Sequence, residues 1–295
     1  MYLHDFEYFN QLILQKSFSK VAAYFNVSQP TISSAIKRLE NELDTTLVIR
    51  DRSHNELIVT PSGQQFAQHV ATILNEWRVS KAEIERLNRQ QLFFGIPPII
   101  QNSYFAKIAH ALQQRQMLAE ITLVEAESSI LRRRLLAGEI DLALLGTITN
   151  DNDPELSRTE LGRSPFRIFL SKDHPLAQKK AGVYFADLKK ENFIIFASSF
   201  AHTEAIRIMA RQNHFTPKII FQSHDVNFLM NMVAENVAIT FLSEVATPNR
   251  DDIISIPILD EAQPMFITSL VYRTNHMLTP TQQALLGVID ELYHH

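Results

Sequence analysis

The sequence predicts an α/β protein made of a small N-terminal domain, one long connecting helix and a larger region of two α/β subdomains. Three observations predict this organisation. Apolar residues recur at helical spacing in three short segments before residue 45, and a single helical pattern runs from Pro61 to about Arg89. From Gln91 onward, short runs rich in Val, Ile and Phe alternate with helical patterns, which is typical of βαβ units.

The composition fits two or three domains with proper cores. The chain has 295 residues, of which 45% are hydrophobic, and it has no cysteine. The absence of cysteine excludes disulfides and cysteine-based metal sites. The first residues, MYLHDFEYF, lack the basic start and apolar centre of a signal peptide, and no apolar run approaches the roughly 20 residues that span a bilayer. We therefore expect a cytoplasmic protein.

Two short amphipathic helices are predicted at the N-terminus. The apolar face of the first consists of Phe6, Phe9, Leu12 and Ile13. The second is predicted to be capped by Ser19 and to bury Val21, Ala22 and Phe25, and Asn26 and Val27 form the turn that follows. The alternative is an ordinary all-helical core, which does not need an exposed polar helix start.

The third helix has the pattern of a DNA recognition helix. Ser28 is predicted as its N-cap, and Pro30 fits its first turn because that position needs no N–H. One stripe of the helix is apolar and predicted to be buried, namely Ile32, Ile36, Leu39 and Leu43. The other sides carry Gln29, Ser33, Ser34, Lys37 and Arg38, which remain free for a partner. Docking into a major groove requires this polar, exposed helix start.

A β-hairpin and the long helix come next. The runs Leu47–Ile49 and Leu57–Val59 predict the hairpin, a wing beside the recognition helix. The helix from 61 to 89 would extend roughly 40 Å, too far for the small domain to cover its apolar seam. We expect this seam to dimerise through Phe66, Val70, Ile73, Trp77 and Ile84. The alternative is that the helix packs on its own C-terminal domain.

Net charge does not identify the N-terminal segment as DNA-binding. Residues 1–60 contain six Lys or Arg and seven Asp or Glu, so their formal charge is 6 − 7 = −1. The basic residues nevertheless lie mainly around the third helix and the hairpin, and phosphate binding depends on such local placement.

The region after residue 90 is predicted as two βαβ-type halves. Strands are expected at 92–96, 120–125, 140–145, 166–170, 193–196, 218–222, 238–242 and 266–272. Helices are expected at 103–114, 129–137, 203–213, 226–235 and 280–292. Open α/β sheets bind ligands beyond the carboxyl ends of their strands. Four junctions there are candidates for a ligand site: 97–103, 127–129, 199–203 and 223–225. Helix capping alone also explains their polar residues.

A search for catalytic and metal-binding patterns returns little. The sequence has no glycine-rich phosphate loop, no G-x-S-x-G and no H-E-x-x-H, and only seven glycines. Six of the histidines are isolated from any partner at ligand spacing. We therefore expect no enzyme, no cofactor and no metal. Another possibility is a small-molecule binding protein or transferase-like enzyme without DNA binding, whose N-terminal helices serve only for association.

Residues 1–60 resemble the winged helix-turn-helix of LysR-type transcriptional regulators. The matching positions are Phe9, Ser17, Phe18, Ala22, Val27, Ser28, Gln29, Pro30, Ile32, Ser33, Ile36, Leu39, Glu40, Leu43, Leu47, Arg50, Thr60, Pro61, Ser62 and Gly63. Departures occur at Lys16 and Asp44, where the family usually has glycine, at Val48 for Phe, and at Ser34 for a basic or amide residue. The later pattern of two crossing subdomains extends the resemblance over the whole chain.

The resemblance implies four segments and two kinds of partner. The segments are a winged helix-turn-helix (1–60), a linker and dimerisation helix (61–89), effector subdomain I (90–160 and 268–295) and effector subdomain II (161–267). The two effector subdomains are expected to be periplasmic-binding-protein-like. It implies a homodimer or homotetramer on double-stranded promoter DNA. The whole chain is also similar to regulators of malolactic fermentation and related organic-acid metabolism, which implies a small carboxylate inducer such as malate.

Candidate site residues follow from these segments. For DNA we expect Ser28, Gln29, Pro30, Thr31, Ser33, Ser34, Lys37, Arg38, Arg50, Arg52 and His54. For the effector we expect Pro98, Ile99, Ile100, Gln101, Ser128, Thr147, Ser199, His202 and Thr203. Few Lys or Arg lie at these strand ends, so helix amides and hydroxyls are expected to hold the carboxylate.

Overall fold

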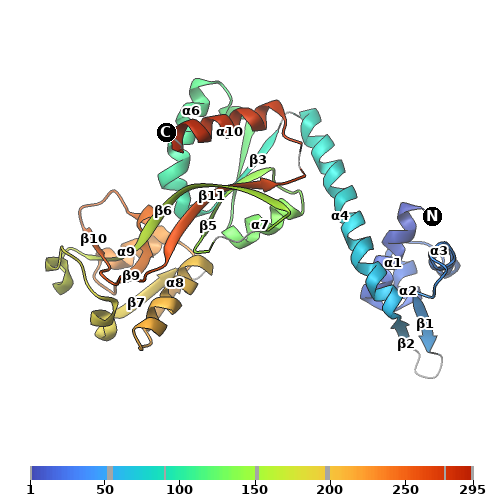
Figure 1. The fold of residues 1–295 in the computed structure, drawn as a ribbon, viewed down its shortest axis with the longest axis horizontal. Coiled ribbons are helices and arrows are strands. Elements are labelled where there is room, and N and C mark those ends of the chain that lie inside the picture. The colour runs from blue at the N-terminus through green and yellow to red at the C-terminus, as the bar shows by residue number, and fades with distance from the viewer. Residues whose placement is uncertain are drawn as a thin grey trace. The chain divides into compact units, whose positions relative to one another are not determined.

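The computed structural model describes residues 2–51, 56–89, 91–149, 153–196, 200–275 and 277–293. The chain forms two compact units, Met1–Ile84 and Glu85–His295 (Figure 1). The long helix α4 (Pro61–Arg89) begins in the first unit and ends in the second. None of the helices in the described part of the chain is long and apolar enough to cross a membrane.

The first unit has the predicted winged helix-turn-helix. It consists of α1 (Leu3–Gln15), α2 (Phe18–Tyr24), α3 (Gln29–Glu42), the antiparallel strands β1 (Val48–Asp51) and β2 (Glu56–Val59), and most of α4. Its core consists of fully buried side chains, including Phe9, Leu12, Ile32, Leu39, Leu47 and Val70. Residues 52–55, among them Arg52 and His54, lie outside the described residues.

Two predicted details of these helices were wrong. Ser17, not Ser19, is the N-cap of α2 and accepts a hydrogen bond from the Lys20 amide, because the helix begins at Phe18. The buried stripe of α3 ends at Leu39. Leu43 is the C-cap and is 41% exposed, since the chain leaves the helical path there.

Lys16 and Asp44, which stand where the family usually has glycine, have a positive φ angle. Lys16 has φ of 50° and Asp44 has φ of 48°, both in the left-handed region. An L-residue with a side chain is disfavoured there by roughly 1–2 kcal/mol, whereas glycine is not. These two turns are therefore strained relative to the same turns built with glycine.

Two residues of the expected dimerisation seam, Phe66 and Val70, pack in the core of the first unit. Val70 is fully buried, and the ring of Phe66 packs 5.9 Å from that of Phe6 and 5.3 Å from that of Phe9, measured between centroids. These two residues therefore complete the core of their own domain. The remaining seam residues are exposed, Ile73 by 42%, Trp77 by 47% and Ile84 by 57%.

The second unit has two α/β subdomains that share two long strands. Subdomain I contains β3 (Leu92–Ile96), β4 (Ile121–Glu125), β5 (Leu142–Thr147), α5 (Pro98–Ile100), α6 (Ala106–Gln114), α7 (Ser128–Leu136) and α10 (Pro280–Tyr293). Subdomain II contains β7 (Asn192–Phe196), β8 (Lys218–Ser223), β9 (Thr240–Ser243), β10 (Ile253–Pro257), α8 (Phe200–Gln212) and α9 (Val226–Ala234). The shared strands are β6 (Leu156–Ser171) and β11 (Met265–Arg273).

The shared strands join the two subdomains in one sheet, whose order is β10-β6-β11-β5-β3-β4, with β9 also paired to β6. β6 pairs antiparallel with β11 from Leu156 to Pro165, and its second half pairs with β10 and β9. The sequence predicted only residues 166–170 of β6 and missed β10. The first half of β6 is mostly polar, with Leu156 and Leu161 as its large apolar residues, so it lacks the alternating pattern that predicts a strand.

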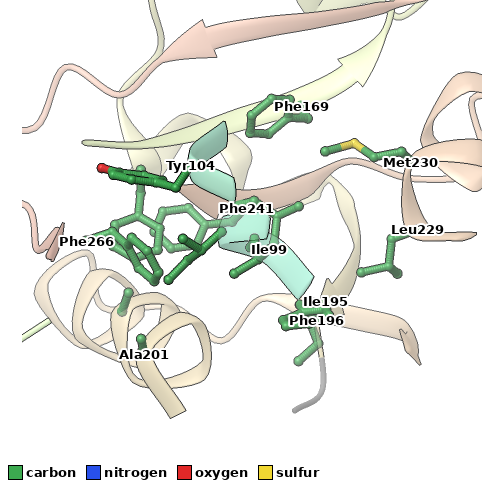
Figure 2. Close-up of a cluster of buried hydrophobic side chains, with 14 of the residues drawn as sticks. Ile99, Tyr104, Phe169, Ile195, Phe196, Ala201, Leu229, Met230, Phe241 and Phe266 are labelled. Atoms are coloured by element: carbon green, nitrogen blue, oxygen red, sulfur yellow. The ribbon is translucent and has the colours of Figure 1, made fainter. Parts of the chain in front are cut away.

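Aromatic and aliphatic side chains from both subdomains form one continuous core (Figure 2). The rings of Phe166 and Phe241 stack in parallel with centroids 4.8 Å apart. Phe266 on β11 packs edge-on against Phe166, with centroids 6.2 Å apart. Because this core crosses from one subdomain to the other, their facing sides are held together by apolar packing as well as by the sheet.

Arg38 is engaged within the first unit. Its guanidinium donates two hydrogen bonds to the carboxylate of Asp5, from Nη2 to Oδ1 at 2.5 Å and from Nε to Oδ2 at 3.2 Å. Asp5 is only 1% exposed and also accepts a bond from the Tyr2 amide. Burial opposes ionisation of Asp5, but the bonds from Arg38 and Tyr2 outweigh it and hold its pKa below the usual value. The sequence predicted that Arg38 remains free for a partner. The ion pair occupies two of its N–H groups, and 42% of its side chain stays exposed.

We predict that Arg38→Ala destabilises the protein by about 3 kcal/mol, because it leaves a buried carboxylate without its counter-charge. Asp5→Ala should cost less, since the half-exposed Arg38 can be hydrated. Urea unfolding at pH 7 measures both. The contribution of Asp5 is present above its usual pKa of about 4 and is lost as the pH falls through its lowered folded value. Equal stability of Arg38→Ala and wild type would contradict this account.

Candidate functional site

The start of α3 presents a polar surface. Ser28, Gln29, Pro30, Thr31, Ser34 and Lys37 are exposed, and Ser33 is half-buried. Local bonds hold some of these side chains: the Ser28 and Thr31 hydroxyls lie 2.8 Å apart, and the Ser19 hydroxyl donates to Gln29 Oε1 at 3.3 Å. The exposed groups include both donors and acceptors, as recognition of base edges requires.

Arg50, on strand β1, is fixed beside this surface. Its Nη2 donates to Ser33 Oγ at 2.9 Å, and its guanidinium carbon lies 3.8 Å from the centroid of the Phe18 ring. Stacking on an aromatic face while bonding to a hydroxyl is a mode suited to arginine, because its planar group can do both at once. The hairpin thus adds a positive charge next to the start of α3.

A pocket of about 370 Å³ lies in the second unit, between the two subdomains. Its walls come from the loop after β3, the junction of β4 and α7, the ends of β7 and β8, and β11. The apolar part consists of Pro97, Pro98, Ile99, Ala126, Ile130, Phe196 and Phe266. Figure 2 shows Ile99, Phe196 and Phe266 among the labelled side chains of the neighbouring core. The volume suits a small ligand.

The polar part of the pocket comes from Glu125, Glu127, Ser128, Arg134 and His224. The Ser128 hydroxyl accepts a hydrogen bond from the Gly146 amide at 2.9 Å, which ties the start of α7 to β5. No side chain caps the first amides of α7, because Glu127, its N-cap residue, does not bond to them. These amides and Arg134 can attract an anionic group.

The structure brings three of the expected effector residues to this pocket, namely Pro98, Ile99 and Ser128. Gln101 lies behind the wall, where its amide donates to Glu125 at 3.1 Å. Thr147 is not part of the pocket lining, and its hydroxyl donates to the Thr149 carbonyl. Thr203 is half-buried on α8 and is also outside the lining. Ser199 lies outside the described residues.

Two further expected residues are buried in the core. Ile100 is fully buried, so it supports the wall instead of facing a ligand. His202 is 3% exposed and accepts a bond from the Ser243 amide at 3.3 Å. Its ring lies 5.9 Å from that of Phe196 and 5.2 Å from that of Phe266, between centroids. His202 therefore stands behind the two aromatic side chains of the pocket.

Sequence reasoning missed Arg134, Ile130, Phe196 and Phe266 as pocket residues. Ile130 and Arg134 lie one and two helical turns after Glu127, so they share its face of α7. That spacing was visible in the sequence. The two phenylalanines reach the pocket only because the last residue of β7 and the start of β11 lie beside subdomain I, which no local pattern reveals.

Comparisons with known proteins assign the class. A family model described as LysR substrate binding domain matches residues 85–293, and one described as bacterial regulatory helix-turn-helix protein of the lysR family matches residues 3–64. The chain belongs to the LysR family of transcriptional regulators. It is thus a DNA-binding regulator with an effector-binding domain and not an enzyme, which excludes the alternative without DNA binding.

Individual relatives cover nearly the whole chain. The malolactic fermentation system transcriptional activator of Lactococcus lactis is 30% identical over 291 residues, 98% of each protein. The dual regulator OxyR of Escherichia coli is 25% identical over 98% of this chain and 95% of its own.

Solved structures show the same fold. The LysR-family regulator HinK of Pseudomonas aeruginosa has a TM-score of 0.60 at 19% identity, covering 99% of this chain and 98% of its own. The effector binding domain of QuiR in complex with shikimate also has a TM-score of 0.60, at 14% identity, covering 69% of this chain and 97% of its own.

We predict a pH dependence that originates at His202. Burial lowers the pKa of His202 from 6.5 to about 3, so the folded protein keeps the ring neutral while the unfolded chain binds a proton below pH 6.5. This contribution to stability is complete above pH 6.5 and falls as the pH decreases, by at most about 1.4 kcal/mol per pH unit. Urea unfolding of wild type and His202→Gln between pH 7 and 4 measures the difference. Parallel curves for the two proteins would contradict the assignment.

Proposed function

We propose that this LysR-family regulator acts in the cytoplasm as a homodimer or homotetramer on promoter DNA, and that a small carboxylate such as malate or another organic acid modulates its binding. The observation that carries the effector proposal is the pocket between the subdomains, which combines an apolar wall with the uncapped start of α7 and Arg134. The name of the Lactococcus lactis relative supports organic-acid metabolism as the regulated process.

The decisive test is a gel shift with the protein's own upstream region, with and without malate and related organic acids. A salt-sensitive specific complex that changes with one of the acids is the expected result. A thermal-shift experiment runs in parallel, because a ligand at 100 times its dissociation constant stabilises a protein by about 2.7 kcal/mol. A complex that responds to none of these acids would overturn malate and its relatives as effectors and leave the DNA-binding function intact.

DNA contacts in this proposal fall into two groups. Gln29, Pro30, Ser33 and Ser34 meet base edges, with Ser28 and Thr31 at the helix start. Lys37 and Arg50 meet the phosphates, together with Arg52 and His54 of the hairpin. The exposure of the α3 start and the fixed position of Arg50 support this division. Arg38 belongs to the second group as well, since 42% of its side chain remains exposed beside its ion pair with Asp5.

We predict different effects for one residue of each group. Gln29→Ala should relax sequence preference at a cost of about 1–3 kcal/mol, because a glutamine can pair bidentately with adenine. Arg50→Ala should weaken binding to all sequences and reduce the salt slope by about one. Fluorescence anisotropy on specific and random duplexes at several salt concentrations measures both, with the exposed Gln68→Ala on α4 as control. Wild-type binding by both variants would refute this docking mode.

Dimerisation in this proposal uses the exposed part of the α4 seam. Ile73, Trp77 and Ile84 lie on one helix face, and all three are exposed in the single chain. Pairing α4 with α4 of a second copy would cover this face and bring two recognition helices to successive half-sites. Phe66 and Val70 support the helix from inside their own domain.

We predict that Trp77→Glu combined with Ile84→Glu separates the subunits and abolishes operator binding, because two charges would enter an apolar interface. Since both side chains are exposed, the folded monomer should keep its thermal stability. Ala71→Glu, exposed on the opposite side of α4, is the matched control. Sedimentation velocity and a gel shift report the two effects. An intact dimer in the double variant would assign the interface to another surface.

A further inference from the structure

We propose that the effector of this protein is an amino acid with an apolar side chain, whose protonated amine is held by Glu125 and Glu127 while its carboxylate faces the start of α7. This inference rests on the proposed function, because it narrows the carboxylate class of the same pocket to carboxylates that also carry an amine.

Two unneutralised carboxylates line the pocket. Glu125 is the last residue of β4 and Glu127 is the N-cap of α7, in extended conformation, so the two side chains leave the chain on the same side. Within the described part of the chain, Glu125 bonds only to the neutral amide of Gln101. Glu127 lies 3.7 Å from Nδ1 of His224, a side chain that is 75% exposed. Neither carboxylate has a lysine or arginine partner there.

The charge balance of the lining disfavours a simple anion. The lining contains one arginine and two glutamates, so its formal charge with His224 neutral is 1 − 2 = −1. Arg134 is also 3.8 Å from Glu139, outside the pocket, which weakens its pull on a ligand. A dicarboxylate such as malate would bring two more negative charges to this wall. A protonated amine on the ligand would instead be attracted by the two glutamates.

The carboxylate of such a ligand can bind at the start of α7. Glu127 leaves the first amides of α7 uncapped, and the Ser128 hydroxyl is occupied by the Gly146 amide. These amides point a positive partial charge at the pocket, directly beside the Glu127 side chain. The ammonium and carboxylate of an α-amino acid are attached to the same carbon. Glu127 directly precedes the first amides of α7, so neighbouring groups of the ligand would meet neighbouring groups of the pocket.

The remainder of the ligand faces an apolar wall. Pro97, Pro98, Ile99, Ile130, Phe196 and Phe266 have no side-chain groups that form hydrogen bonds. A second polar group buried against this wall would lose its hydration without compensation. The volume of about 370 Å³ accommodates an aliphatic or aromatic side chain of amino-acid size.

The experiment compares amino acids with the 2-hydroxy acids of the same skeleton, which differ only by a hydroxyl in place of the ammonium. Leucine and 2-hydroxyisocaproate, phenylalanine and phenyllactate, and aspartate and malate are titrated into the full-length protein by calorimetry. We expect leucine or phenylalanine to bind at least tenfold more tightly than its hydroxy acid, and more tightly than aspartate.

Charge-removing variants identify the groups responsible. Glu125→Gln combined with Glu127→Gln keeps the shape of the pocket and should bring the amino and hydroxy acids to within about twofold of each other. Glu261→Gln, an exposed glutamate outside the pocket lining, should keep the tenfold preference. Circular dichroism of the variants checks that they are folded.

The outcomes separate the inference from the proposed function. A hydroxy acid that binds as tightly as its amino acid overturns the inference and leaves a carboxylate effector in place. Binding of no member of any pair overturns both the inference and the carboxylate class, while the gel shift still reports on DNA binding. A preference that survives in the double glutamine variant removes the two glutamates from the amine site and overturns the inference.

Discussion

The pairing of β6 with β11 is the constraint on which the second unit depends. Both strands belong to both subdomains, and their antiparallel register runs from Leu156 opposite Arg273 to Pro165 opposite Met265. In the sheet, β5, β3 and β4 follow on the β11 side, and β10 and β9 pair with β6. β7 and β8, whose ends contribute Phe196 and His224 to the pocket, form a separate parallel pair. The register shifts between Thr268 and Ser269, opposite Gly162 and Glu160. The shift leaves Leu161 of β6 without a partner on β11, and such an irregularity locally increases the twist of the strand pair.

Gly146 shows how closely the pocket is built on that strand pair. It is paired with Thr268 of β11, and its amide donates to Ser128 at the start of α7. A Cβ at this position would lie 2.1 Å from the ring of Phe266, which also lines the pocket. The lack of a side chain on one residue therefore permits both the close approach of the Phe266 ring and the anchoring of α7. The apolar wall and the polar end of the pocket are positioned by the same short segment of β5.

The sequence predicted best the elements that depend on local residue patterns. The helix pattern around Ser28, the hairpin and the long helix are encoded in periodicity and capping, and the structure confirms them. It failed where a residue's role depends on distant partners. Nothing near Arg38 indicates that Asp5, 33 positions earlier, occupies its guanidinium, and nothing near Val70 indicates that the small domain needs it as core. For the pocket, the junctions were predicted, but Phe196, Phe266 and the burial of His202 follow from how the subdomains meet.

The end of α4 is fixed to the second unit around one buried carboxylate. In the last turns of the helix, Arg86 forms an ion pair with the buried Asp141 at 3.1 Å and donates to the Gly138 carbonyl at 2.7 Å. Asp141 also accepts the Phe93 amide at 2.8 Å, so one carboxylate joins α4, β3 and the start of β5. Gly138, which follows α7, is thus bonded to the same arginine as Asp141. The first residues of α7 line the pocket. Breaking this buried ion pair would leave an uncompensated charge, so the contact holds the last turns of α4 to the end of α7 within the second unit. A ligand can shift DNA binding only by the difference in its affinity for the two states of the protein that it connects, so a contact such as this one matters only if it differs between those states.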